Sequence, residues 1–287
     1  MEQQIRFLVG QYYDIQKLRV EAFNRIVAYV KSHNIVGTQI RHASQPEIEP
    51  QTKNASQKPN ETQMEVAVKP STIAHKIIKN KLPVPSEIKD LVWYHNSLLY
   101  TEKELAKRLD AWSSHHPLRI NWLSKIYGVG PILSSALIAW LGPISRFDNI
   151  SKLWKYCGMA PGQKRKRGQK INYNPHLKTL MWKIASSFEK QKATKSRYRR
   201  IYDEKKRYYL NRPDLHEAIE KKKKGAKLHV RLMAMRFTVK RFLADTWIVW
   251  RKMEGLPVTK PYAHTILHHT DFVIPQPDKV DEEEEIW

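Results

Sequence analysis

The chain has 287 residues, of which 41% are hydrophobic, and this is enough apolar material to fill a core and to exclude a disordered protein. No run approaches the roughly 20 uncharged apolar residues of a membrane span, and the first residues lack the apolar block of a secretory signal. We therefore expect an intracellular protein that is cytoplasmic and associated with the nucleoid. The single cysteine, Cys157, fits a reducing compartment, and we expect its side chain to be buried.

The formal net charge of +23 is unevenly distributed along the chain. Basic residues outnumber acidic ones by 17 to 12 in residues 1–121 and by 33 to 10 in residues 122–271, whereas residues 272–287 hold one basic and six acidic side chains. Between Lys164 and Arg207, 16 basic residues are interleaved with aromatic ones. Self-repulsion on this scale disfavours a compact state unless a polyanion offsets it, so nucleic acid is the expected partner. A basic face that contacts only solvent is the alternative.

Two predicted helices flank a polar segment in the N-terminal part of the chain. Apolar residues recur every three or four positions from Ile5 to Val30, which predicts an amphipathic coiled-coil helix within residues 1–35. Residues 36–85 include a stretch rich in Gln, Pro, Asn and Thr, so we expect a flexible linker. A helical pattern resumes over residues 86–118, and we expect this second helix to pair with the first as a coiled-coil-like hairpin that supports homo-oligomers.

Residues 119–260 are predicted to form a domain of helices punctuated by Gly and Pro. The expected helices cover residues 120–127, 131–141, 150–157, 175–191, 195–210 and 229–253. A short strand hairpin over residues 164–172 is only weakly supported, because alternating apolar residues are missing there. Residues 261–287 are expected to be a C-terminal tail with an acidic end. The predicted fold class is therefore mainly α.

The residues Gly128, Val129 and Gly130 predict the turn of a helix-hairpin-helix motif. Two glycines are expected because the turn needs backbone conformations that a Cβ forbids and because the backbone must approach its partner closely. Pro131 suits the first position of the following helix. Backbone N–H groups at the start of that helix would hold a phosphate oxygen without reading the base sequence. A simple helix-to-helix turn is the alternative, and the neighbouring positive charge favours phosphate contact.

The candidate DNA-binding residues lie in the hairpin, in the basic loop that follows later, or in the polar segment after that loop. They are Lys125, Gly128, Val129, Gly130, Lys164, Arg165, Lys166, Arg167, Lys170, Asn172, Asn174, His176 and Lys178. The turn residues are expected to present backbone donors, the basic loop to follow the sugar-phosphate backbone, and the polar segment to add side-chain contacts.

The segment from Gly128 to Ala185 resembles the C-terminal domain of the insertion-sequence one-ten/one-sixteen family of transposases. The strings that carry the resemblance are GVGPILSSALIAWLGPISRFDNISKLWKYCGMAP and NPHLKTLMWKIA. Upstream, LVGQYYDIQKLRVEAFNRIVAYV looks like the family's coiled-coil segment and HNSLLYTEKELAKRLDAWSSHHP looks like its second helix, so the resemblance extends from about residue 8 to residue 190. It implies a DNA-binding protein of transposition or recombination and, because these recombinases are guided by a structured RNA, a guide RNA as a further partner.

Two departures from the family leave catalysis open. Full-length members begin with a RuvC-like domain whose four acidic residues bind magnesium, and no strand ending in Asp precedes the first predicted helix here, so we expect that domain to be missing. The family's nucleophilic serine is also not found, because no serine occurs between Ser151 and Ser186. Tyr173 lies in this region, and we expect it to pack or stack, because an unactivated phenol with a pKa near 10 is a poor nucleophile.

No cofactor and no metal are predicted. His264, His268 and His269 include an i, i+4 pair, but no Cys or carboxylate pattern completes a metal site. The leading hypothesis is therefore DNA binding in transposition or recombination. The alternatives are an active recombinase that uses the nuclease centre of a partner subunit, and an RNA-binding assembly scaffold.

Overall fold

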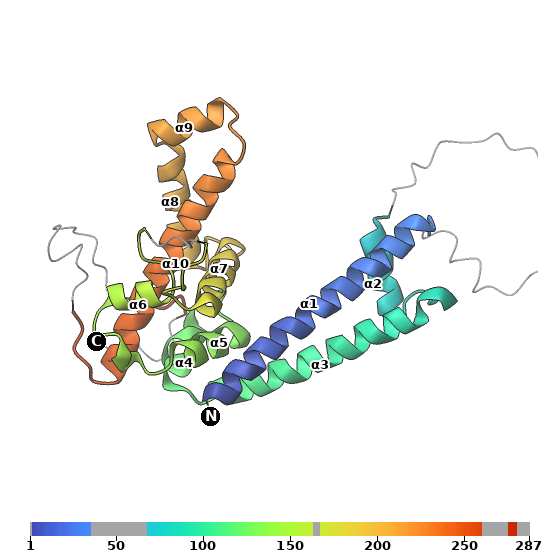
Figure 1. The fold of residues 1–287 in the computed structure, drawn as a ribbon, viewed down its shortest axis with the longest axis horizontal. Helices are drawn as coiled ribbons and strands as arrows, with labels where there is room; N and C mark the ends of the chain where they lie inside the picture. The colour runs from blue at the N-terminus through green and yellow to red at the C-terminus, as the bar shows by residue number, and fades with distance from the viewer. Residues whose placement is uncertain (1, 36–67, 163–166, 260–274, 280–287) are drawn as a thin grey trace, which may run out of the picture. The chain divides into compact units, whose positions relative to one another are not determined.

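The computed structural model describes residues 2–35, 68–162, 167–259 and 275–279 (Figure 1). The described residues are mainly helical and contain no strand, which confirms the predicted fold class. The weakly supported strand hairpin is absent from the part that is described, residues 167–172, which forms turns and bends. Contacts divide the chain into two compact units, one made of Met1–Val9 with Ala106–Trp287 and the other of Gly10–Leu105.

The smaller unit contains most of α1 (Glu2–Ser32), α2 (Pro70–Ile78) and most of α3 (Lys89–Ser114), which follows a 3-10 turn, Ser86–Ile88. Its core joins all of these elements. The buried side chains of the core are Ile26, Val30, Ile73, Ala74, Ile77, Ile88 and Val92.

The prediction of a flexible linker over residues 36–85 is wrong for residues 70–78, because these form α2, which packs as part of this core. Ile73 and Ile77 are one helical turn apart and both are buried, and Pro70 occupies the first turn, where a missing N–H costs nothing. The stretch rich in Gln, Pro, Asn and Thr lies before this helix in the sequence. Residues 36–67 lie outside the described residues.

A buried carboxylate joins α1 to α3 in this unit. Glu102 is 7% exposed and accepts hydrogen bonds from Arg19 Nε and from Gln16 Nε2, the latter at 3.0 Å. Burial alone would raise the pKa of Glu102, but the hydrogen bonds from Arg19 and Gln16 outweigh burial and lower it. Because Tyr29 also bonds Glu87 at 3.1 Å, the two helices run antiparallel, as expected of a helical hairpin. A coiled coil and homo-oligomers stay predictions.

The larger unit is built around the last helix, α10 (Ala226–Met253). The other helices are α4 (Pro117–Asn121), α5 (Pro131–Leu141), α6 (Ile150–Tyr156), α7 (Pro175–Glu189), α8 (Arg197–Leu210) and α9 (Pro213–Glu220), with 3-10 turns at Leu123–Lys125 and Ile144–Arg146. In Figure 1, α8, α9 and the first part of α10 form an arm that projects from the other helices of this unit.

Aromatic side chains anchor α10 in the core of the larger unit. Phe188 of α7, Tyr198 of α8 and Phe242 of α10 are buried and pack with ring centroids 4.7 to 5.4 Å apart. The buried indole of Trp247 donates a hydrogen bond to the carbonyl of Phe147 at 2.8 Å, so its polar atom is satisfied. Cys157 is fully buried, as predicted. In the described residues, no helix combines the length and the apolar character needed to cross a bilayer.

Glu189, at the C-terminal end of α7, connects three helices. Its carboxylate accepts hydrogen bonds from Arg231 Nε of α10 at 2.7 Å and from the hydroxyl of Tyr202 of α8 at 2.7 Å. The Arg231 hydrogen bond is the main reason why the pKa of Glu189 is lower than usual. The ion pair therefore stabilises the position of α7 against the arm.

We predict that Glu189→Gln lowers the free energy of unfolding by about 2 kcal/mol at neutral pH, because charge-assisted hydrogen bonds from Arg231 are lost. The folded-state pKa is lowered, so the stabilisation is present above the usual value of 4.5 and is lost as the pH falls below it. Urea unfolding at pH 7 and at pH 4 measures both effects. Glu204→Gln, at a carboxylate that is 64% exposed, is the control and should change little. Equal midpoints for both variants at pH 7 would contradict this role.

Candidate nucleic-acid interface

Gly128, Val129 and Gly130 connect the 3-10 turn Leu123–Lys125 to α5. Gly128 has φ +94°, a conformation that favours glycine, and a Cβ there would lie 3.2 Å from the Ser187 hydroxyl oxygen. Val129 is buried, whereas Gly130 is exposed. The segment before the turn is a 3-10 turn, and the predicted helix over residues 120–127 is replaced by this turn and α4. The break falls at Trp122, whose φ of −136° is not helical.

Several backbone groups of the turn have partners within the chain. The Ser187 hydroxyl donates a hydrogen bond to the carbonyl of Gly128 at 2.7 Å. The N–H of Val129 donates to the carbonyl of Ile126 at 3.2 Å, and the N–H of Tyr127 donates to a carboxylate oxygen of Asp278 at 2.8 Å. The turn is therefore not an open row of amide donors. Its exposed part is Gly130 together with the start of α5.

The N-terminus of α5 is suited to hold an anion. Gly130 is the residue before the helix, Pro131 is its first residue, and both are exposed. No side chain among the described residues caps this end. The first amides of an α-helix have no acceptor within the helix, and the helix dipole makes this end positive. An acceptor from outside the chain, such as a phosphate oxygen, would satisfy these groups.

A basic segment that follows α7 lies against the same turn. Gln191, the second residue after α7, would lie 3.2 Å from a Cβ at Gly128, as would the Ser187 hydroxyl oxygen. We call residues 190–200, from the end of α7 into the first turn of α8, the basic segment. Its exposed basic side chains are Lys190, Lys192, Lys195 and Arg200. These residues belong to the basic run of the sequence but were not among the predicted site residues. The signal that could have found them is a series of lysines directly after the end of a predicted helix that packs on the glycine turn.

The other candidate residues lie at the opposite end of α7. The ring of His176, at the start of α7, stacks on Trp140, at the end of α5, with centroids 4.1 Å apart and planes 9° apart. Because Ser187 contacts the turn before α5, the two helices run antiparallel. Fifteen residues at 1.5 Å each separate the two ends of α7 by about 20 Å. The structure therefore divides the predicted site residues into two groups, with Asn172 to Lys178 distant from the hairpin.

Several residues of this second group have structural partners. Asn174 caps α7, because its side-chain oxygen accepts hydrogen bonds from the N–H groups of His176 at 3.0 Å and Leu177 at 3.2 Å. Lys178 Nζ lies 4.5 Å from the centre of the Tyr173 ring, so Tyr173 packs as expected.

The basic loop is described only in part. Arg167, Lys170 and Asn172 are exposed. Lys164, Arg165 and Lys166 lie outside the described residues. The loop as a contact to the sugar-phosphate backbone stays a prediction.

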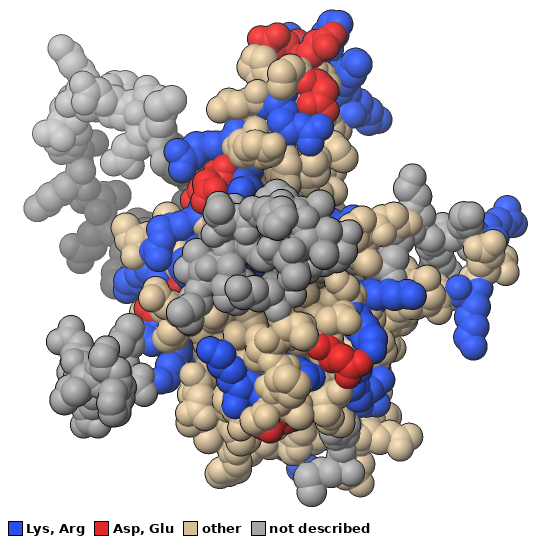
Figure 2. Space-filling view, turned by 90° about the vertical axis from the view of Figure 1, so that its left-hand side faces the viewer, with Lys and Arg blue, Asp and Glu red and all other residues tan. Residues whose placement is uncertain are grey.

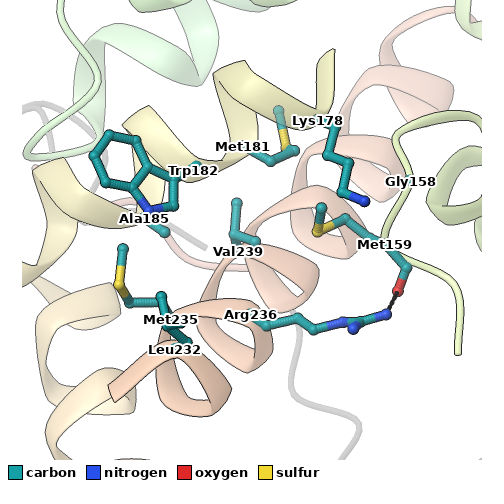
Figure 3. A pocket seen from close by; sticks show the side chains of 10 residues that line it. All are labelled: Gly158, Met159, Lys178, Met181, Trp182, Ala185, Leu232, Met235, Arg236 and Val239. Carbon is teal, nitrogen blue, oxygen red and sulfur yellow. Dashed lines mark hydrogen bonds between the residues drawn. The ribbon is translucent and has the colours of Figure 1, made fainter. Parts of the chain in front are cut away.

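A pocket of about 200 Å³ opens between α7 and α10 next to Lys178 (Figure 3). Its lining is mostly apolar and includes Met181 and Met235, and the indole of Trp182 at its edge is 53% exposed. The guanidinium of Arg236 donates a hydrogen bond to the carbonyl of Met159 at 3.2 Å on the other side. An exposed indole is a surface on which an unstacked base can pack, and Lys178 and Arg236 lie across the pocket from it.

The charge of the described residues on one face of the molecule is mixed. Figure 2 shows one face, on which Lys and Arg side chains are dispersed and are interrupted by acidic ones. The described residues form no single basic stripe on this face. The backbone geometry at α5 and the neighbouring basic segment are therefore the more specific features.

The described residues contain no group of three or more His, Cys, Asp or Glu side chains that could hold a metal ion. His264, His268 and His269 lie outside these ranges. The buried carboxylate of Asp245 belongs to the core, because it accepts a hydrogen bond from Tyr198 at 2.9 Å and pairs with Arg241 at 3.0 Å. Its burial raises its pKa.

The two glycines of the turn should differ in their response to substitution. Gly128→Ala should lower the free energy of unfolding by about 1–2 kcal/mol, because φ is positive and the new Cβ would crowd Ser187. Gly130→Ala should change it by less than about 0.5 kcal/mol, because φ is −80° and no atom lies within 4 Å of the new Cβ. Chemical denaturation measures both, and similar losses for the two variants would contradict the described geometry.

Comparison with known proteins gives one positive result. A search of curated proteins and a search of solved structures found no match. The family model described as Transposase IS116/IS110/IS902 family matches residues 120–199, which contain the glycine turn, α5, α7 and the basic segment except Arg200. This match confirms the resemblance seen for Gly128 to Ala185 and suggests a function related to transposition. The chain thus carries, at residues 120–199, a region similar to the transposases of the IS116/IS110/IS902 family.

Proposed function

We propose that this chain binds the phosphate backbone of DNA during transposition or recombination, with the start of α5 as the central contact. The observation that carries this proposal is the exposed, uncapped N-terminus of α5 beside the basic segment after α7. Amide donors at a positive helix end bind an anion, and neighbouring lysines add attraction that depends on salt. The family match over residues 120–199 supports DNA as the polyanion.

The second group of residues would extend the contact. Arg167, Lys170 and Lys178 supply positive charge near the start of α7, and Trp182 offers a stacking surface. We propose that these side chains contact the nucleic acid along α7, with the three cations about 20 Å and Trp182 about 10 Å from the end that packs on the hairpin. Structured RNA is the competing ligand, because phosphate contacts alone distinguish DNA from RNA poorly.

The central contact can be tested by placing a carboxylate where we propose a phosphate. Gly130 is extended and has open space around its Cβ position, so Gly130→Asp should fold and should cap α5. We predict unchanged or slightly higher thermal stability but at least about tenfold weaker binding to a short DNA duplex, because the carboxylate occupies the amides and repels phosphate. Gly130→Asn supplies the same cap without charge and should weaken binding less. Equal affinity of Gly130→Asp and the wild type would overturn the contact.

The basic segment can be tested by salt titration. We predict that the logarithm of the binding constant falls linearly with the logarithm of salt concentration, with a slope that becomes shallower by about 0.9 for each phosphate contact removed. Replacing Lys190, Lys192 and Lys195 by Ala should therefore flatten the slope measured by fluorescence anisotropy. The charge-matched control replaces Lys76, Lys79 and Lys81, which are exposed in the smaller unit. A wild-type slope near zero, or equal effects of the two triple variants, would contradict the proposal.

A further inference from the structure

A short C-terminal segment, residues 275–279, is docked on the glycine turn through its acidic side chain. One carboxylate oxygen of Asp278 accepts a hydrogen bond from the N–H of Tyr127 at 2.8 Å. The other accepts a hydrogen bond from the N–H of Arg197 at 2.6 Å. Two backbone amides from separate parts of the chain therefore converge on one anionic group.

Further polar contacts hold the segment in place. The N–H groups of Asp278 and Lys279 donate to the carbonyl of Lys125 at 3.2 and 3.1 Å. The ammonium group of Lys279 donates to the carbonyl of Ser124 at 3.2 Å, and the guanidinium of Arg197 donates to the carbonyl of Gln276 at 3.3 Å. The residues of this segment are half-buried or exposed. Hydrogen bonds to backbone groups, rather than burial of apolar side chains, thus account for the docking.

The two amides have the properties of a site for an anion with two acceptor oxygens. Arg197 is the first residue of α8, a helix of 14 residues, so its N–H has no acceptor within the helix. The Ser196 side chain caps the N–H of Arg199 and leaves the N–H of Arg197 to Asp278. The N–H of Tyr127 comes from the other side, next to the glycine turn. The helix dipole adds positive potential. The guanidinium of Arg197 is paired with the buried Asp245 at 3.5 Å.

We propose that the amides of Tyr127 and Arg197 form a binding site for a DNA phosphate, which Asp278 fills when no nucleic acid is bound. This inference rests on the proposed function and adds to it a second phosphate contact and an internal competitor. Tyr127 directly precedes the glycine turn and Gly130 ends it, so the two contacts flank the same turn. A phosphodiester has two unesterified oxygens and can accept the same pair of hydrogen bonds as the carboxylate.

The proposal predicts that removal of the carboxylate strengthens DNA binding. When a competing group fills the site for about 90% of the time, its removal raises the apparent affinity about tenfold. We expect Asp278→Ala in the full chain to bind a 20-base-pair duplex roughly three to ten times more tightly than the wild type at the same salt concentration. Asp214→Ala, at an exposed carboxylate paired with Arg212, changes the net charge equally and should have a much smaller effect. Unchanged or weaker binding by a folded Asp278→Ala protein would overturn the proposal.

A second measurement observes the site itself. Titration of inorganic phosphate into the isotope-labelled protein should shift the amide signals of Tyr127 and Arg197 in Asp278→Ala, and should shift them much less in the wild type. Asp278→Asn keeps the size of the side chain and serves in place of the Ala variant if that protein does not fold. If neither amide responds in a folded variant, no anion site exists there. If both amides respond but neither the wild type nor the Asp278 variants bind DNA, the proposed function fails while the anion site stands.

Discussion

The hydrogen bond from the Ser187 hydroxyl to the carbonyl of Gly128 fixes the part of the molecule on which the other functional features depend. It joins the end of α7 to the turn before α5, and it does so at a residue whose positive φ favours glycine. The stacking of His176 on Trp140 holds the other ends of the same two helices together. The start of α5, the basic segment and the first residue of α8 are placed around one turn by this packing.

Helix positions in the larger unit could be predicted from the sequence where local signals agree. The helix predicted over residues 131–141 is α5 itself, because Pro131 begins it and Gly142 ends it. The predicted helix over residues 175–191 corresponds closely to α7, which Asn174 caps. The predictions missed α9 and α2, which are short. Their helical pattern spans only about two turns, too few for apolar periodicity to stand out, and α2 is stabilised by its contacts with α1 and α3.

The candidate site could be predicted only in its local parts. The glycine turn was found because the two glycines and Pro131 are neighbours in the sequence. The distance between the turn and Asn172 to Lys178 depends on the antiparallel packing of α5 and α7, which spacing along the chain does not reveal. The hydrogen bonds between Asp278 and the amides of Tyr127 and Arg197 join residues that are far apart in sequence and follow no periodic pattern. The partners of a side chain such as Asp278 can be identified only when the fold is known.

The length of α7 has a consequence for the size of any ligand that contacts both of its ends. A hydrogen-bonded helix of 15 residues behaves as a rigid spacer of about 20 Å. Successive nucleotides on one strand of a B-form duplex are 3.4 Å apart along the axis, so this spacer corresponds to about six base pairs. Under the proposed contacts, a shorter duplex would reach one end of the helix at a time, so the length of α7 would set a minimum footprint for the ligand.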